Sequence, residues 1–86
     1  MGSYKVVVKK SAVKEIEKLN KKDTQRVIER IKKLGEDPRP IGSKKLSGQE
    51  KYRVRQGNFR ILYQIFEDTL IVTVVKVGNR KDVYRS

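Results

Sequence analysis

The sequence predicts an α+β protein in which two helices cover one face of a mainly antiparallel, four-stranded sheet, in the order βααβββ. Apolar residues recur at helical spacing in the first half of the chain, between residues 11 and 35. From Lys51 onward they alternate with polar residues, and two short turn signals interrupt this alternation. The 86 residues are expected to form one domain, 1–86.

The N-terminal half predicts a strand and a helical hairpin. Residues 4–8 are rich in β-branched side chains and are typical of a short strand. Ser11 is predicted to cap the first helix and Asp23 the second, and Gly35 is predicted to follow the end of the second. The connection at residues 20–22 is so short that the two helices must be antiparallel neighbours. Their lysine-rich faces are interpreted as solvated scaffold.

A polar loop separates this hairpin from the alternating segment. Residues 38–50 are rich in proline, glycine and serine. Lys44 and Lys45 in this loop are candidate phosphate contacts, and an ordinary surface loop explains them equally well.

The C-terminal half predicts three strands joined by tight hairpins. The strands are expected at residues 51–56, 59–66 and 69–77. The turns are expected at Gly57-Asn58 and Glu67-Asp68, each with two residues. The second turn would place Ile65 opposite Leu70.

The first turn brings arginines together. With glycine first, as a type II′ turn prefers, Arg55 lies opposite Arg60. Side chains alternate between the faces of a sheet, so the apolar residues point towards the helices, and Arg53, Arg55 and Arg60 share the open face. Like charges placed directly opposite are mildly destabilising. A bridging phosphate would offset this repulsion, because arginine binds phosphate through two parallel hydrogen bonds. In the alternative, the arginines extend into water or are neutralised by Glu50 or Asp82.

The charge of the chain indicates the kind of partner. Twenty-two lysine and arginine residues against ten acidic residues give a net charge of +12, which attracts nucleic acid or an acidic protein. The alternative is that the excess only keeps a small protein in solution. Without cysteine or a signal-type apolar segment, the chain is expected in the cytoplasm, with no membrane partner.

The residue types restrict the chemistry that the chain can perform. With no histidine and no cysteine, serine–histidine–aspartate, zinc and cysteine–histidine catalysis are excluded, and neither a metal nor a cofactor is expected. What remains is catalysis by positioned cations, as in RNA cleavage by attack of the 2′-hydroxyl group on the adjacent phosphorus, which also requires two proton transfers. Arg80 should emerge from the last strand near Arg60. Tyr84 is the leading candidate base, since neighbouring guanidinium groups would lower its pKa; packing of the tail is the alternative.

The chain resembles the RelE/ParE superfamily of toxins from toxin–antitoxin pairs. The resemblance spans nearly the whole sequence and is carried by KLSG, YRVRQGNFRILY and VGNRKDVY. It implies a metal-independent endoribonuclease that cleaves mRNA in the ribosomal A site, leaving a 2′,3′-cyclic phosphate. It also implies an acidic antitoxin as partner; the free toxin is expected to be a monomer. The implied catalytic residues are Arg53, Arg55, Arg60, Arg80 and Tyr84.

Further basic residues are expected to contact RNA around this site: Lys44, Lys45, Lys51, Lys81 and Arg85. Two alternatives to the nuclease remain open. One is a ParE-like toxin that inhibits DNA gyrase, and the other is a basic RNA-binding module without catalytic activity.

Overall fold

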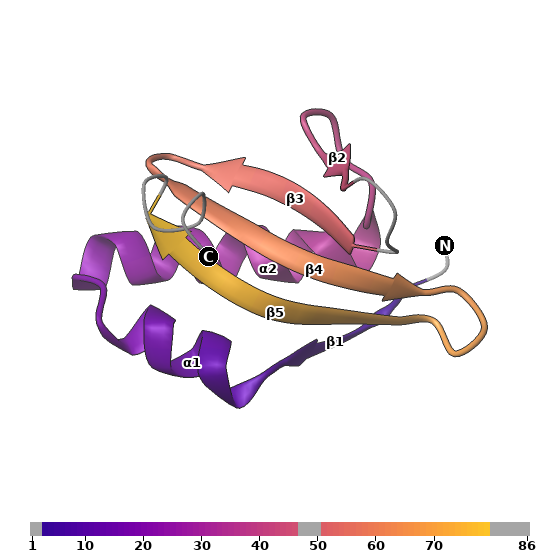
Figure 1. Cartoon of the computed structure of the whole chain (residues 1–86), viewed down its shortest axis with the longest axis horizontal. Helices are drawn as coiled ribbons and strands as arrows, with labels where there is room; N and C mark the ends of the chain where they lie inside the picture. The colour runs from indigo at the N-terminus through magenta and orange to yellow at the C-terminus, as the bar shows by residue number, and fades with distance from the viewer. Residues whose placement is uncertain (1–2, 47–50, 80–86) are drawn as a thin grey trace.

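The computed structural model describes residues 3–46 and 51–79. Within them the elements are β1 (Lys5–Val8), α1 (Lys10–Glu17), α2 (Lys21–Glu36), β2 (Lys44–Lys45), β3 (Lys51–Gln56), β4 (Phe59–Phe66) and β5 (Ile71–Asn79). Both helices pack against the same side of the sheet (Figure 1). The predicted α+β class and the order of its helices and main strands are confirmed.

The sheet has five strands in the described residues, one more than predicted. Their order is β1-β5-β4-β3-β2. β1 runs parallel to β5, and the remaining neighbours are antiparallel. The additional strand, β2, is the two-residue segment Lys44–Lys45 inside the predicted loop. Two lysines in a polar loop carry no alternation or β-branched signal, so the sequence did not reveal this strand.

The predicted helix boundaries need correction. α1 begins at Lys10 with Lys9 at the N-cap position, and no side chain caps it, so the prediction for Ser11 was wrong. The cap of α2 is Asn20 instead of Asp23. The Asn20 side chain accepts a hydrogen bond of 2.8 Å from the Asp23 backbone N–H, and its amide donates to the Asp23 carboxylate at 3.0 Å. Asp23 thus lies in the first turn, where its charge complements the helix dipole.

Gly35 lies inside α2, and not after its end as predicted. Its carbonyl oxygen accepts a hydrogen bond of 2.7 Å from the backbone N–H of Tyr4. A Cβ atom at this position would lie 2.9 Å from Cγ2 of Val6 and 3.1 Å from the carbonyl oxygen of Tyr4. The glycine therefore permits a close approach of β1 to α2.

One of the two predicted turns is confirmed. Gly57 has φ +60°, Asn58 has a negative φ, and Arg55 pairs with Arg60, as a type II′ turn requires. The second connection is longer than predicted, because Phe66 pairs with Ile71 and residues 67–70 form the turn. Ile65 therefore faces Val72 and not Leu70.

A β-bulge in β5 changes which side chains face the core. Leu62 pairs with Lys76, but the next residue, Tyr63, pairs with Val74, so Val75 is an extra residue. The bulge reverses the alternation along the strand. Val77 is buried, and Lys76 lies on the face away from the helices.

The core lies between the sheet and the two helices. It contains the following buried side chains: Ala12, Ile16, Val27, Ile31, Leu34, Tyr52, Val54, Ile61, Tyr63, Ile65, Val72, Val74 and Val77. No described helix covers the other face of the sheet (Figure 1). No helix in the described ranges is long and apolar enough to cross a membrane. The fold thus presents one face of the sheet for polar and charged side chains.

Candidate nucleic-acid interface

The sheet face away from the helices carries two neighbouring pairs of cationic residues. Arg55 of β3 lies opposite Arg60 of β4. In the adjacent row, Lys44 of β2 lies opposite Arg53 of β3. Directly opposite residues have Cβ atoms about 5 Å apart, so each pair concentrates positive charge. The predicted convergence of the three arginines is confirmed in the strand register, and Lys44 joins them.

The three arginines differ in exposure. Arg55 is exposed and Arg53 is half-buried, whereas Arg60 has an exposed fraction of only 1%. The expectation of arginines on a fully open face was therefore wrong for Arg60. β4 lies between β3 and β5. Arg60 lies opposite Arg55 of β3 on one side and opposite Gly78 of β5 on the other. The surrounding fold thus restricts the rotamers of Arg60.

A small hollow lies at the end of this hairpin. It has a volume of about 40 Å³ and is lined by Arg55, Gly57, Asn58, Phe59 and Arg60. This volume exceeds what a single water molecule needs, about 10–15 Å³. Two guanidinium groups on one such hollow provide several hydrogen-bond donors for one anionic group.

Three of the lysines predicted to contact RNA belong to the described residues, and they do not all lie on the same face. Lys44 lies beside Arg53, and Lys51 shares the same face because it is two residues before Arg53 in β3. Lys45 pairs with Tyr52, whose side chain belongs to the core, so Lys45 points towards the opposite face. The structure therefore brings Lys44 and Lys51 to the arginines but not Lys45.

Four predicted site residues lie outside the described residues: Arg80, Lys81, Tyr84 and Arg85. The pairing of Asn79 with Phe59 brings the end of β5 beside the hairpin turn. The predicted proximity of Arg80 to Arg60 remains a prediction.

Lys76 is a cation on this face that the sequence did not indicate. A regular strand with Val72 and Val74 in the core would turn Lys76 towards the core as well. The bulge at Val75 places Lys76 opposite Leu62 instead, which lies two residues from Arg60 on the same face of β4. No residue pattern marks the bulge, so only the structure identifies Lys76.

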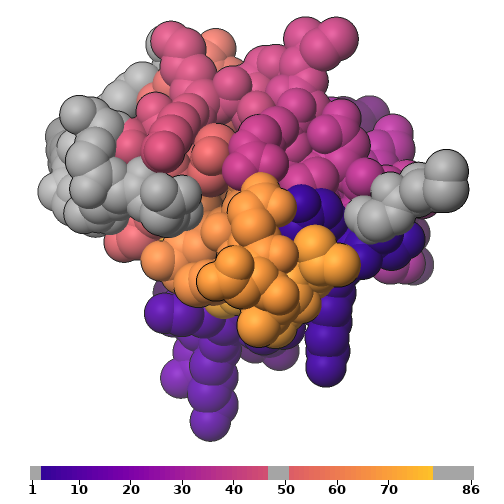
Figure 2. All heavy atoms as spheres, turned by 90° about the vertical axis from the view of Figure 1, so that its right-hand side faces the viewer, coloured from indigo at the N-terminus to yellow at the C-terminus, as the bar shows by residue number. Residues whose placement is uncertain are grey.

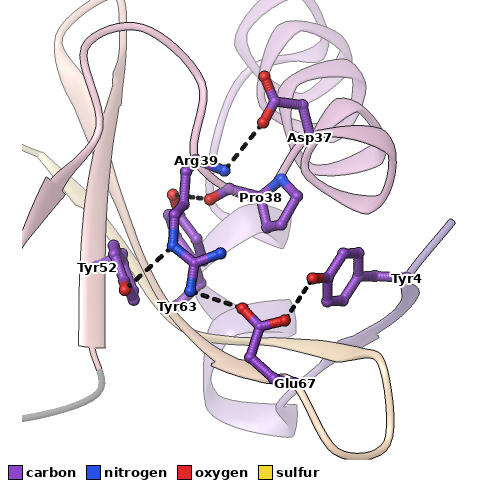
Figure 3. A network of polar contacts seen from close by, with 7 residues as sticks. All are labelled: Tyr4, Asp37, Pro38, Arg39, Tyr52, Tyr63 and Glu67. Carbon is purple, nitrogen blue, oxygen red and sulfur yellow. Dashed lines mark hydrogen bonds and ion pairs between the residues drawn. The ribbon is translucent and has the colours of Figure 1, made fainter. Parts of the chain in front are cut away.

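A polar network holds the loop that leads to Lys44 (Figure 3). Arg39 donates to Glu67 at 2.6 Å and, through Nε, to the Tyr52 hydroxyl at 3.3 Å. Its guanidinium carbon lies 5.3 Å from the centre of the Tyr52 ring, within reach of a cation–π contact. Tyr4 donates to the other oxygen of Glu67 at 2.6 Å. In Figure 2 the segments involved lie together, with the β4–β5 connection (orange) between the N-terminal strand (indigo) and the loop region (magenta).

The pKa values of several groups around this loop are shifted. The hydrogen bond from Tyr4 and the ion pair with Arg39 lower the pKa of the Glu67 carboxyl group below its ordinary value. Burial raises the pKa of Tyr63 to about 12. The Tyr63 hydroxyl donates a hydrogen bond of 2.6 Å to the carbonyl oxygen of Pro38, which fixes the start of the same loop.

Tyr63→Phe is expected to make the protein less sensitive to alkaline unfolding. The folded-state pKa of Tyr63 is raised above the ordinary value of 10. The contribution of the Tyr63 hydroxyl to the free energy of unfolding is therefore fully present below pH 10 and is lost as pH rises towards 12. A shift of two units corresponds to about 3 kcal/mol. Urea unfolding of both proteins between pH 8 and pH 11.5 measures this difference. If the free energies of unfolding of the two proteins changed with pH in the same way, the raised pKa would not belong to Tyr63.

The arrangement is suited to binding a polyanion. The residues that the structure describes contain no group of three or more histidine, cysteine, aspartate or glutamate side chains placed to hold a metal ion. Cationic pairs on the sheet face that no described helix covers instead provide the charge and the hydrogen-bond donors that phosphate groups require.

Comparison with known families identifies the class of protein. The model of the family described as ParE toxin of type II toxin-antitoxin system, parDE, matches residues 6–84. The chain therefore belongs to this family of toxins, as the resemblance to the RelE/ParE superfamily predicted.

Similar proteins carry RelE names. A RelE-like toxin protein of Escherichia coli is 38% identical, over 94% of this chain and 90% of the relative. A chain of the archaeal RelE–RelB complex from Pyrococcus horikoshii has a TM-score of 0.82 and 27% identity, covering 91% of this chain and 96% of that chain. A chain of the RelBE2 toxin–antitoxin complex from Mycobacterium tuberculosis has a TM-score of 0.81 and 25% identity, covering 91% and 99%.

Proposed function

We propose that this toxin is a ribosome-dependent endoribonuclease that cleaves mRNA in the A site. The observation that carries the proposal is the adjacency of the Arg55–Arg60 and Lys44–Arg53 pairs on the face without helices. Like charges at directly opposite positions repel one another. Such an arrangement is favourable when a phosphate backbone occupies this face.

The proposed reaction uses the 2′-hydroxyl group of the RNA as nucleophile. A bond forms between the 2′-oxygen and the adjacent phosphorus, and the bond from phosphorus to the 5′-oxygen of the next nucleotide breaks. The products are a 2′,3′-cyclic phosphate and a 5′-hydroxyl group. Arg55 and Arg60 stabilise the negative charge that develops on the phosphorane oxygens.

The two proton transfers need other groups. Arginine is a poor base because its pKa lies above 12. Tyr84 is the proposed base that accepts the proton of the 2′-hydroxyl group, and Arg80 adds charge stabilisation. The leaving 5′-oxygen receives a proton from a group in the same site or from water.

An acidic antitoxin is the proposed protein partner. A net charge of +12 favours a partner of opposite charge. The similar chains from Mycobacterium tuberculosis and Pyrococcus horikoshii were solved in complexes of RelE with RelB, the former described as a toxin–antitoxin complex. The proposed place of action, the ribosome, implies that the toxin acts in the cytoplasm.

The family match favours one second candidate, inhibition of DNA gyrase, because the matching family is that of ParE. This activity requires no phosphate-cleaving site. The clustered arginines therefore favour the nuclease.

Primer extension on mRNA bound to purified ribosomes tests the proposal. Wild-type toxin is expected to cut within the A-site codon, and Tyr84→Phe to cut at least about 100-fold more slowly. Supercoiling by purified gyrase is measured in parallel. Inhibited gyrase with intact mRNA would establish the second candidate, and intact mRNA with active gyrase would indicate a binding module.

A further inference from the structure

A second, larger pocket adjoins the arginine face. It has a volume of about 360 Å³, which lies within the range of small-molecule sites. It is lined by Arg30, Gly42, Lys44, Arg53 and Arg55. Four of these five residues are cationic and none is acidic, so the pocket has a strongly positive potential.

Arg30 reaches this pocket from a different layer of the fold. It belongs to α2, whose buried side chains pack against the other face of the sheet. The short strand β2 pairs only with residues 52 and 53 of β3. The edge of β3 beyond them, up to Gln56, is not paired with β2, and Arg30 lines the pocket beside this edge.

The Arg30 side chain is partly buried without a hydrogen-bond partner. Its Nε atom is shielded from solvent and has no partner among residues 3–46 and 51–79. A buried guanidinium donor without an acceptor is unfavourable, because the loss of its hydration is not compensated. The sequence pattern assigns this helix face to the scaffold, and packing alone does not require an arginine here.

Arg55 connects the two hollows. It lines the larger pocket together with Arg30, and it lines the small hollow together with Arg60. Two anionic groups that occupy both hollows would therefore share Arg55. Neighbouring phosphates of one nucleic-acid strand meet this requirement.

We propose that Arg30, Lys44 and Arg53 form a second phosphate subsite that binds the backbone of single-stranded RNA next to the phosphate held at Arg55 and Arg60. The choice of RNA rests on the proposed nuclease function. Arg30 is a positioning residue: it holds the strand in register and does not touch the reacting atoms. The pocket volume leaves room for a sugar beside the phosphate.

Binding of a short single-stranded RNA with 2′-O-methyl groups, which cannot be cleaved, tests the subsite. Fluorescence anisotropy over a range of salt concentrations gives the affinity and its salt dependence. Arg30→Ala is expected to weaken binding about 10-fold at low salt, since a charge-assisted hydrogen bond is lost. The slope of log K against log salt should fall in magnitude by about 0.7, as expected for one lost phosphate contact.

Arg26→Ala is the matched control. Arg26 is exposed, lies one helical turn from Arg30 and does not line the pocket. The Arg26→Ala substitution removes the same charge as Arg30→Ala and should leave the affinity for RNA within about twofold of wild type. Arg30→Lys should recover part of the loss, because it restores the charge but not the planar fork. Equal affinities and slopes for Arg30→Ala and Arg26→Ala would overturn the proposal.

Two further measurements separate binding from folding and from cleavage. In the wild-type protein, the Nε–H resonance of Arg30 should shift when the RNA is added, and an unchanged resonance would contradict the subsite. If Arg30→Ala weakened the binding of duplex RNA but not of single-stranded RNA, the proposed subsite would also be contradicted. These assays need no ribosome. If the toxin cleaves mRNA but Arg30→Ala binds RNA as tightly as Arg26→Ala does, the subsite alone is disproved. If the toxin does not cleave mRNA but Arg30→Ala weakens RNA binding, the nuclease function alone is disproved.

Discussion

Replacing Arg60 with methionine is expected to lower A-site mRNA cleavage by at least about 100-fold, the usual cost of removing one donor that stabilises developing charge. Methionine fills a similar length of apolar space at this buried position but carries no charge. Arg60→Lys keeps the charge without the planar fork and should retain intermediate activity. Cleavage rates on programmed ribosomes measure both effects.

The control for this prediction uses a cation on the other face. Lys45→Met removes the same charge, and Lys45 points away from the arginines. Its cleavage rate should stay within about twofold of wild type. Thermal unfolding of each variant verifies that the fold is retained. If a folded Arg60→Met protein cleaves at the wild-type rate, Arg60 is not part of the catalytic site.

Gly57→Val is expected to destabilise the fold by about 1–3 kcal/mol and to weaken RNA binding. Gly57 has φ +60°, a conformation that a β-branched residue rarely adopts. An added Cβ atom would meet no atom within 4 Å, so the effect is due to backbone strain and not to a clash. Relief of this strain would shift the turn that places Arg55 opposite Arg60.

Asn58→Ala is the matched control in the same turn, because Asn58 does not have a positive φ. Urea unfolding should show a change below about 0.5 kcal/mol. A Gly57→Val protein with wild-type stability would show that the turn tolerates another geometry. Wild-type RNA affinity in a destabilised variant would show that the register of the arginines does not determine binding.

The register of the β3–β4 hairpin could be predicted from the sequence because two independent signals agree there. The Gly57-Asn58 turn fixes the pairing, and the alternation of apolar residues excludes a shift by one residue. The structure pairs Arg55 with Arg60 as predicted. The burial of Arg60 was not predictable, since exposure depends on what packs around a central strand.

Other features depend on contacts that local patterns do not encode. The bulge at Val75 reverses the side-chain alternation of β5, so the sequence alone does not place Lys76 on the face of the arginines. Arg30 was not among the predicted site residues, because its place in the pocket depends on how α2 sits behind β3. Both residues lie near the site only through tertiary packing. The roles of Arg80 and Tyr84 rest on the sequence resemblance and remain predictions.

The cationic pairs on the sheet make the toxin's stability a function of its ligands. Arg55 faces Arg60 and Lys44 faces Arg53, and like charges at such positions repel one another. An anion that binds between them removes this repulsion, and by mass action it stabilises the folded state against the unfolded one. If RNA binds this face as proposed, occupancy of the face and resistance to unfolding are thermodynamically linked.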